Sequence, residues 1–132
     1  MVFGTYNKGS RAEHELMKKL QERGFLVIRA AGSGVGSPCP DILAFRRTDQ
    51  MGFECKAIND TSLQLRKEQV ERLHAWQDVS GITTYIAWRI PGGEWRFIRP
   101  AHLRETEKSY SITLKEAQRI GSLFEDLFIG SG

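Results

Sequence analysis

The sequence predicts one α/β domain in which a mixed five-stranded sheet is flanked by helices. Segments with apolar residues at helical spacing and segments rich in β-forming residues occur in the order helix, three strands, helix, two strands. The 132 residues are enough to bury one core but too few for two. We therefore expect a single domain over residues 1–132, with a core at 8–104 and a C-terminal helix and tail at 113–132.

The first expected helix covers residues 11–23 and ends before Gly24. Its apolar face repeats at helical spacing through Ala12, Leu16 and Leu20. Ser10 and Glu13 stand in the S-x-x-E spacing of a capping box, in which the two residues satisfy backbone N–H groups of the first turn. This spacing gives Glu13 a role in stabilising the start of the helix.

Three strands are expected next. A buried strand at residues 25–30 is rich in β-forming residues and leads into a glycine-rich loop at 31–40. Strands at residues 41–46 and 52–57 follow, separated only by a polar turn at 47–51. Because so short a turn leaves no room for a crossover, these two strands should form an antiparallel hairpin.

Helices and strands alternate in the second half of the chain. A polar loop at residues 59–62 is followed by an amphipathic helix at 66–79 and by strands at 82–89 and 94–98. A last helix is expected at residues 114–120. The tail after it is apolar at Leu123, Phe124, Leu127 and Phe128, which either pack into the core or form a twofold interface.

Charge and cysteine content limit the function. The net charge of +3 is compatible with a nucleic-acid partner and equally with solvated surface cations. Cys39 and Cys55 form no CxxC pair, so neither a zinc site nor a disulfide scaffold is indicated. No signal peptide and no apolar run of ~20 residues is present, so we expect a cytoplasmic protein without a membrane partner. Nothing in the sequence indicates a small-molecule cofactor.

Acidic and basic side chains meet on the expected hairpin. Side chains alternate along a strand, so Glu54 and Lys56 point to one face, while the other face carries Phe53, Cys55 and Ala57. Asp41 begins the neighbouring strand and can lie across the hairpin from Glu54. Two converging carboxylates repel each other unless a cation lies between them. Mg²⁺ fits, because it prefers oxygen ligands and takes one or two carboxylates together with water and phosphate.

A metal held in this way favours phosphodiester hydrolysis. It would neutralise charge on a scissile phosphate and lower the pKa of a bound water. Lys56 would orient or deprotonate that water, or stabilise the developing negative charge. The ordinary alternative is a solvated Glu54–Lys56 ion pair on a strand, with Asp41 as a turn residue after Pro40.

The sequence also resembles a known family. Pro40-Asp41 with Glu54-Cys55-Lys56 matches the PD-(D/E)XK nuclease motif, and the surroundings are similar to the archaeal Holliday-junction resolvases. The resemblance extends from Lys8 to about Arg104, whereas the stretch after Ser109 matches no motif. The further matching residues are Lys8-Gly9-Ser10, Ala12-Glu13, Gly24-Phe25, Val27, Arg29-Ala30, Ser33 and Trp95-Arg96-Phe97-Ile98.

This resemblance implies a restriction-endonuclease-like fold and a homodimer. It implies paired nicks in opposing strands of a four-way DNA junction, with 5′-phosphate and 3′-hydroxyl ends and with Mg²⁺, or Mn²⁺ in its place, as the metal. By the same resemblance Glu13 joins Asp41 and Glu54 around the metal or holds a metal-bound water. Ser33 lies near the scissile phosphate, and Arg29 is important for cleavage. Glu13 thus has two expected roles, in the helix cap and at the metal.

Further residues are candidates for DNA contact. Basic side chains of the two helices and the hairpin turn either face solvent or follow phosphates, namely Lys8, Arg11, Arg46, Arg47, Arg66, Lys67 and Arg72. Gln69 in the second helix is expected to reach the active site, where related nucleases often have a glutamine. The loop at 32–37 lacks the G-K-[ST] ending of a P-loop, so it is either a segment that closes over DNA or an ordinary loop.

Three functions remain after the sequence analysis. The first is a junction-resolving nuclease. The second is a PD-(D/E)XK endonuclease that acts on RNA or on other duplex or branched DNA, in restriction or repair. The third is a binding module with a relict site, against which the intact Asp41, Glu54 and Lys56 argue. The resemblance over most of the chain favours the first.

Overall fold

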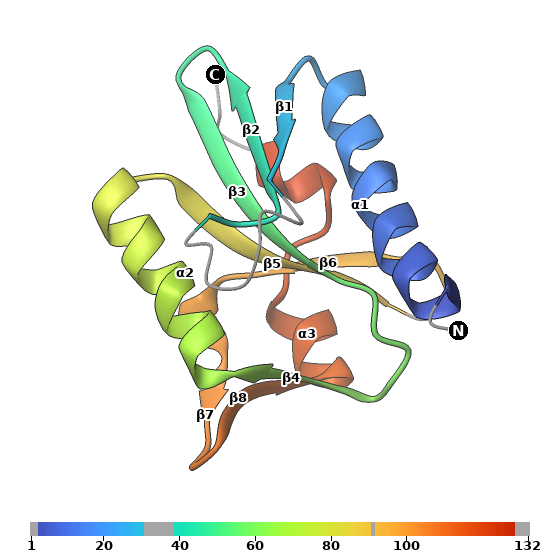
Figure 1. The fold of residues 1–132 in the computed structure, drawn as a ribbon, viewed down its shortest axis with the longest axis vertical. Helices are drawn as coiled ribbons and strands as arrows, with labels where there is room; N and C mark the ends of the chain where they lie inside the picture. The colour runs from blue at the N-terminus through green and yellow to red at the C-terminus, as the bar shows by residue number, and fades with distance from the viewer. Residues whose placement is uncertain (1–2, 31–38, 91, 129–132) are drawn as a thin grey trace.

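The computed structural model describes residues 3–30, 39–90 and 92–128, with side chains from Ser10 onward (Figure 1). A mixed five-stranded sheet forms its centre, as predicted, in the order β1-β2-β3-β5-β6. All neighbouring strands are antiparallel except β3 and β5, which are parallel. The strands are β1 (Leu26–Arg29), β2 (Ile42–Arg46), β3 (Asp49–Lys56), β5 (Thr83–Arg89) and β6 (Trp95–Ile98).

Helices cover both faces of this sheet. On one face α1 (Phe3–Glu22) packs through its apolar stripe onto Phe53 and Phe97 of the sheet. On the other face α2 (Lys67–Ser80) and α3 (Leu114–Ile120) pack against Ile86 and Trp88. Successive strand residues therefore enter two separate cores, as the two-residue period of a strand requires. No helix of the described residues is long and apolar enough to cross a membrane.

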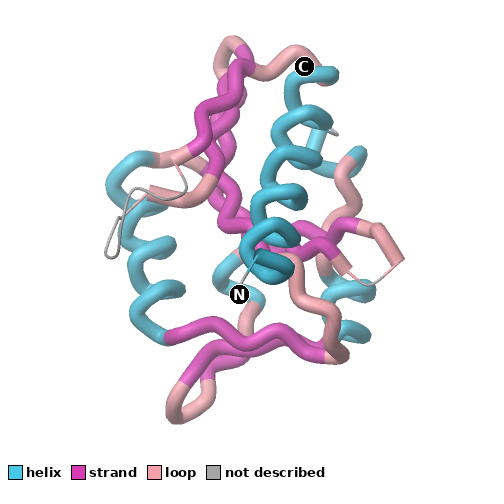
Figure 2. Tube along the Cα trace, turned by 45° about the vertical axis from the view of Figure 1, so that its right-hand side comes forward, coloured by secondary structure: helices cyan, strands magenta, loops and turns pink. Residues whose placement is uncertain are grey.

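A second, three-stranded sheet was not expected from the sequence. It has the order β4-β8-β7 and lies at the bottom of the molecule in both overall views (Figure 2). Its strands are β4 (Ser62–Arg66), β7 (Arg104–Glu105) and β8 (Ser109–Thr113). Leu63 and Leu65 of β4 are buried, while Gln64 between them is exposed. The polar loop expected at residues 59–62 therefore ends at Asp60–Thr61, because β4 pairs with a strand far along the chain.

Two expectations for the N-terminal elements were wrong. α1 begins at Phe3, so Ser10 and Glu13 lie inside the helix and no capping box forms at Ser10. Backbone N–H groups inside a helix already have partners one turn earlier, so a cap has no unpaired groups to satisfy there. β1 is not buried: it is the edge strand of the sheet, and its side chains Leu26 and Ile28 are 66% and 48% exposed.

The C-terminal tail packs within its own chain. From α3 the chain passes the edge of β6, where Ser122 and Phe97 exchange two backbone hydrogen bonds of 2.8 and 2.9 Å. The tail ends in the 3-10 helix η2 (Glu125–Phe128), and a shorter one, η1 (Pro100–His102), precedes β7. Phe124, Leu127 and Phe128 lie against the core beneath α1, which favours the packing alternative over a twofold interface for these three residues.

Candidate active site

Asp41 and Glu54 face each other at the open end of the β2–β3 hairpin. The last paired residues of these strands are Ile42 and Phe53, and the next step of the register places Asp41 opposite Glu54. Asp41 Oδ2 accepts a hydrogen bond of 2.9 Å from the backbone N–H of Cys55. Pro40 packs over Gly52, where a side chain would approach Pro40 Cγ to 3.1 Å. Together these contacts fix Asp41 where the strand begins.

The electrostatics of Asp41 indicate an excess of negative charge. Burial and the nearby Glu54 carboxylate raise the pKa of Asp41 from 3.8 to about 7, with a smaller contribution from Glu13. The Cys55 N–H and the Lys56 ammonium act in the opposite direction on the same pKa. A divalent cation between these carboxylates would relieve the repulsion. The donor set therefore fits a hard metal ion.

Glu54 is oriented from the helix on the opposite side of the site. Gln69 Nε2, in the first turn of α2, donates a hydrogen bond of 2.6 Å to Glu54 Oε2. The sequence analysis expected Gln69 to reach the active site, and the structure places it in contact with the carboxylate. One carboxylate oxygen of Glu54 is thus held, while its other oxygen has no protein donor among the described residues.

Glu13 reaches the site from α1. Its Oε1 accepts a hydrogen bond of 2.9 Å from Arg29 Nε and forms an ion pair with Arg29 Nη2 at 2.8 Å. The side chain of Glu13 is only 13% exposed, and it lies near enough to Asp41 to raise the pKa of that residue. Of the two roles expected for Glu13, the helix cap is excluded. Its carboxylate approaches Asp41 from a third element, α1.

Each of the three carboxylates has its own protein partner. Glu13 is held by Arg29, Asp41 by the Cys55 N–H, and Glu54 by Gln69. Within the part of the chain that is described, no three His, Cys, Asp or Glu side chains are already arranged around one metal position. Mg²⁺ needs only one or two carboxylates, with water and phosphate as its remaining ligands. Asp41 and Glu54 are two carboxylates that fit this requirement, and Glu13 lies near enough to Asp41 to affect its pKa.

Lys56 and two cysteine thiols also lie near these carboxylates. Lys56 lies two residues beyond Glu54 on the same face of β3, and its ammonium lowers the pKa of Asp41. Burial and the adjacent carboxylates raise the pKa of both Cys39 and Cys55, so the thiols stay protonated. The sequence analysis used these cysteines only to exclude zinc and missed that both border the site. The sequence contained a signal for this proximity: Cys39 lies two residues before Asp41, and Cys55 lies between Glu54 and Lys56.

The other predicted site residues are spread over the molecule. Ser33, with the loop at 32–37, and the Lys8 side chain lie outside the described residues. Arg46 lies at the opposite end of β2 from Asp41, where it donates a hydrogen bond to the Arg23 carbonyl. Its guanidinium carbon lies 4.5 Å from the centroid of the Phe25 ring. The remaining candidates lie on α1, on the hairpin turn and around α2, namely Arg11, Arg47, Arg66, Lys67 and Arg72.

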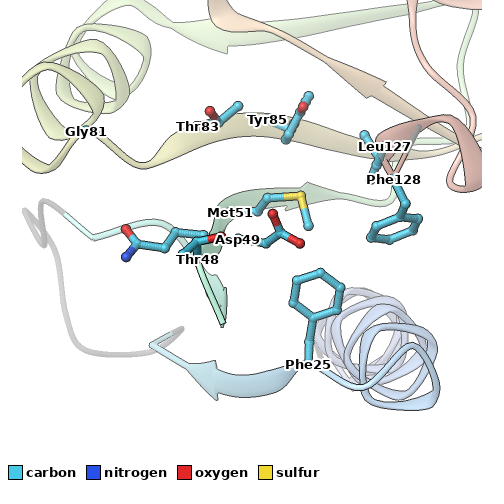
Figure 3. A pocket seen from close by; sticks show the side chains of 10 residues that line it. Phe25, Thr48, Asp49, Met51, Gly81, Thr83, Tyr85, Leu127 and Phe128 are labelled. Atoms are coloured by element: carbon cyan, nitrogen blue, oxygen red, sulfur yellow. The ribbon is translucent and has the colours of Figure 1, made fainter. Parts of the chain in front are cut away.

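A cavity of about 320 Å³ lies away from these carboxylates (Figure 3). It is at the closed end of the β2–β3 hairpin, beside the Asp49–Arg46 pair, whereas Asp41 and Glu54 are at the open end. Its walls combine apolar and aromatic residues with polar ones, namely Phe25, Met51, Tyr85, Leu127 and Phe128 with Thr48, Asp49, Gln50, Gly81 and Thr83. The carboxylate–lysine chemistry is therefore not in this cavity but on the open rim of the sheet.

The fold and the site together define a nuclease of the PD-(D/E)XK class. A mixed sheet presents Asp41 after Pro40, with Glu54 and Lys56 on the adjoining strand and a glutamine on the following helix. Nucleases that use such carboxylates hold divalent metal ions to stabilise the attacking and leaving oxygens. The class does not by itself say which nucleic acid is cut.

Comparison with known proteins identifies the family. The family model of the archaeal Holliday junction resolvases (Hjc) matches residues 4–130. The chain belongs to this family. Two relatives are each called crossover junction endodeoxyribonuclease Hjc. The protein of Archaeoglobus fulgidus is 35% identical over 130 residues, which cover 92% of this chain and 96% of the relative. The protein of Methanocaldococcus jannaschii is 37% identical over 130 residues, which cover 96% of this chain and 90% of the relative.

A solved structure has the same fold. It is the structure of Archaeoglobus fulgidus Hjc, described as a Holliday junction resolvase from an archaeal hyperthermophile. The two structures superpose with a TM-score of 0.80 at 32% sequence identity, over 91% of this chain and 94% of the other. The expected restriction-endonuclease-like α/β fold is thereby confirmed.

Proposed function

We propose that this chain is a crossover junction endodeoxyribonuclease that hydrolyses phosphodiesters of four-way DNA junctions with Mg²⁺ held by Asp41 and Glu54. One observation carries the proposal: Asp41 lies opposite Glu54, and burial with this repulsion raises the pKa of Asp41 to about 7. The near-complete alignment with relatives that bear this name supports the substrate.

The protein groups have separate tasks in this reaction. When bound, Mg²⁺ would neutralise charge on the scissile phosphate and lower the pKa of a bound water, with Mn²⁺ as an alternative ion. The Cys55 N–H and Gln69 fix the directions of Asp41 and Glu54. Arg29 holds Glu13 towards the site. Lys56 supplies a positive charge beside the carboxylates, where it orients the attacking water or stabilises the pentacoordinate phosphate. The products would carry 5′-phosphate and 3′-hydroxyl ends.

The proposed paired nicks require two copies of the site in one assembly. We assign this to a homodimer, and the exposed edge of the main sheet supports it. Leu26 and Ile28 project from β1 on the face opposite α1, beside the half-buried Leu43 and Phe45 of β2. An unpaired edge strand with exposed apolar side chains is a surface that soluble proteins normally cover. A second copy across a twofold axis would cover it and repeat the active site.

A cleavage assay tests this function. Labelled four-way junction, linear duplex and single strand are each incubated with the protein in Mg²⁺ and in EDTA. We expect symmetrically paired nicks in the junction and no cleavage in EDTA. Cutting of linear duplex at a comparable rate would assign the chain to a different endonuclease activity. Junction binding with no cleavage under any divalent metal would refute the catalytic assignment.

The metal role of the carboxylates has its own variants. Asp41→Asn and Glu54→Gln should abolish cleavage while junction affinity stays within about twofold, because each removes a metal ligand and leaves the shape of the site. Lys56→Ala should behave in the same way. The exposed Asp60→Asn on the loop after β3 is the matched control and should cut normally. Loss of junction binding in the neutral variants would contradict a metal role.

A further inference from the structure

Helix α1 has two functional flanks. Its buried stripe contains Ala12, Leu16 and Leu20. Glu13 lies on one side of that stripe, next to the metal site. Arg11 and Glu15 are four residues apart and so share the other side of the helix. The helix therefore separates two polar regions, of which only the first takes part in the chemistry described above.

A second cavity, of about 340 Å³, lies on the flank away from Glu13. It is lined by Arg11, Ala12, Glu15, Ala57 and Arg89. Ala57 directly follows Lys56, the last residue of β3. The chain therefore passes directly from the proposed metal site to this cavity. Arg89 is the last residue of β5, the parallel neighbour of β3.

The guanidinium of Arg89 is held in one orientation. Its Nε donates to Glu15 Oε2 at 2.6 Å and its Nη2 donates to Glu15 Oε1 at 3.2 Å. The indole N–H of Trp95 donates to the same Glu15 Oε2 at 2.7 Å. Trp95 is 5% exposed, and the Arg89 guanidinium lies 6.0 Å from its ring centroid. A buried tryptophan and a carboxylate thus fix an arginine at the wall of an open cavity.

The arginine keeps donors that the carboxylate does not use. A guanidinium has five N–H groups, and the pair with Glu15 involves Nε and Nη2. The third nitrogen, Nη1, faces Gly93, where a Cβ atom in place of hydrogen would approach it to 3.3 Å. Gly93 has a φ of +96°, a conformation that favours glycine. The absence of a side chain at Gly93 thus lets the Arg89 guanidinium lie close to this turn, where a Cβ atom would also approach Nη2 to 3.5 Å.

The charges of the cavity wall favour an anion. Two guanidinium groups, Arg11 and Arg89, face one carboxylate, Glu15. Both oxygens of that carboxylate already accept hydrogen bonds, from Arg89 and Trp95. Glu15 and Arg89 therefore compensate each other's charge, and the positive charge of the cavity wall is that of Arg11. A planar guanidinium held in place suits phosphate oxygens, which it binds with two parallel hydrogen bonds.

We propose that this cavity binds a backbone phosphate of the DNA at a position separate from the cleaved bond, with Arg89 and Arg11 as its donors. The inference rests on the proposed function, since it takes junction DNA as the ligand. A phosphate contact of this kind places the DNA on the protein without reading its sequence. Glu15 and Trp95 act as positioning residues, because they hold Arg89 and do not touch the phosphate.

Binding experiments with the cleavage-deficient Asp41→Asn protein test the site. Affinity for labelled junction is measured over a series of salt concentrations for Arg89→Ala, Arg11→Ala and the control Arg119→Ala, an exposed arginine of α3. Loss of one phosphate contact should weaken binding by roughly tenfold at about 0.1 M salt and reduce the slope of log K against log salt by about 1. The control should change affinity by less than about twofold.

Neutral phosphate analogues separate direct contact from a structural effect. Junctions with single methylphosphonate linkages are scanned to find one, away from the cleaved bond, that weakens binding to the protein with an intact cavity. In Arg89→Ala that linkage should no longer matter. Reduced binding with unchanged sensitivity at every linkage would make the Glu15–Arg89 pair purely structural and would overturn the proposal.

The remaining outcomes are also decisive. Equal affinity and equal salt slope for Arg89→Ala, Arg11→Ala and Arg119→Ala would refute the site. If Arg89→Ala unfolds, Arg11→Ala still tests the cavity, because it leaves the Glu15–Arg89 pair intact. Failure of the wild-type protein to bind or cut any junction would refute the proposed function instead. The two failures are therefore distinguishable.

Discussion

Gln69 of α2 and Glu54 of β3 are joined by a hydrogen bond of 2.6 Å, which connects the helix to the edge of the sheet where we propose that the metal binds. The glutamine amide can orient the carboxylate without contributing charge. Groups that orient metal ligands typically change metal affinity or activity by about 10–100-fold when they are removed.

Gln69→Ala should therefore slow junction cleavage by about 10–100-fold and raise the Mg²⁺ concentration needed for half-maximal rate. Single-turnover rates over a Mg²⁺ series measure both effects. Gln64→Ala, an exposed glutamine of β4, serves as the control. An unchanged Mg²⁺ requirement in Gln69→Ala would show that the hydrogen bond does not act through the metal.

The pKa of Asp41, raised to about 7 from an ordinary value of 3.8, predicts how stability depends on pH without metal. Between these values the folded protein binds a proton that the unfolded chain has released. Stability in EDTA should therefore fall as pH rises from about 4 to about 7 and then level off. Thermal melts in EDTA measure this slope. In Asp41→Asn the slope should be smaller, and at pH 8 the variant should melt at a higher temperature than wild type.

The same pKa predicts the pH dependence of metal stabilisation. A divalent metal binds the ionised carboxylates and must displace the proton of Asp41 at low pH. Mg²⁺ should raise the melting temperature clearly at pH 8 and little at pH 5.5. The Asp41→Asn protein should show almost no Mg²⁺ effect at either pH. A Mg²⁺ effect of equal size at both values would contradict this assignment of the ligands.

Arg29 and Glu13 should act as one unit. Arg29→Ala removes the hydrogen bond and the ion pair of the Glu13 carboxylate, and Glu13→Gln removes the charge that Arg29 holds. Each variant should reduce cleavage, and the double variant should cut no more slowly than the worse single variant. Single-turnover rates complete this double-mutant cycle. Additive losses would mean that the two residues act separately.

The edge strand β1 should carry the dimer contact. Leu26→Asp places a charge at a side chain that is 66% exposed in the single chain. It should change the free energy of unfolding by less than about 1 kcal/mol and yet give a monomer in sedimentation experiments. Ile58→Asp, at a side chain that is 40% exposed outside this edge, is the control. A dimer that persists in Leu26→Asp would place the interface elsewhere.

Elements defined by local pattern could be predicted from the sequence. The β2–β3 hairpin, α2 and α3 formed where period and turn residues indicated them, because their hydrogen bonds are local or join adjacent segments. β4 was missed because its partner β8 is more than 40 residues away along the chain. A five-residue segment with two buried leucines has too little pattern of its own to be distinguished from a loop.

Burial and long-range polar contacts were harder to predict from the sequence. An apolar strand at the edge of a sheet and one at its centre have the same composition, so β1 was expected to be buried although its neighbour is on one side only. The approach of Asp41 to Glu54 was predictable because a short hairpin brings the two strands together. The Glu15–Arg89–Trp95 group was not, since Glu15 is separated from the other two by 74 and 80 residues.

Because α1 carries Glu13 on one flank and Arg11 on the other, the proposed metal site and the second cavity lie to either side of one helix, which is about 10 Å wide with its side chains. DNA that occupies both sites must place one phosphate on each side of α1, at a separation that matches the two sites. The helix would then reject nucleic acids by their shape before any bond is cut.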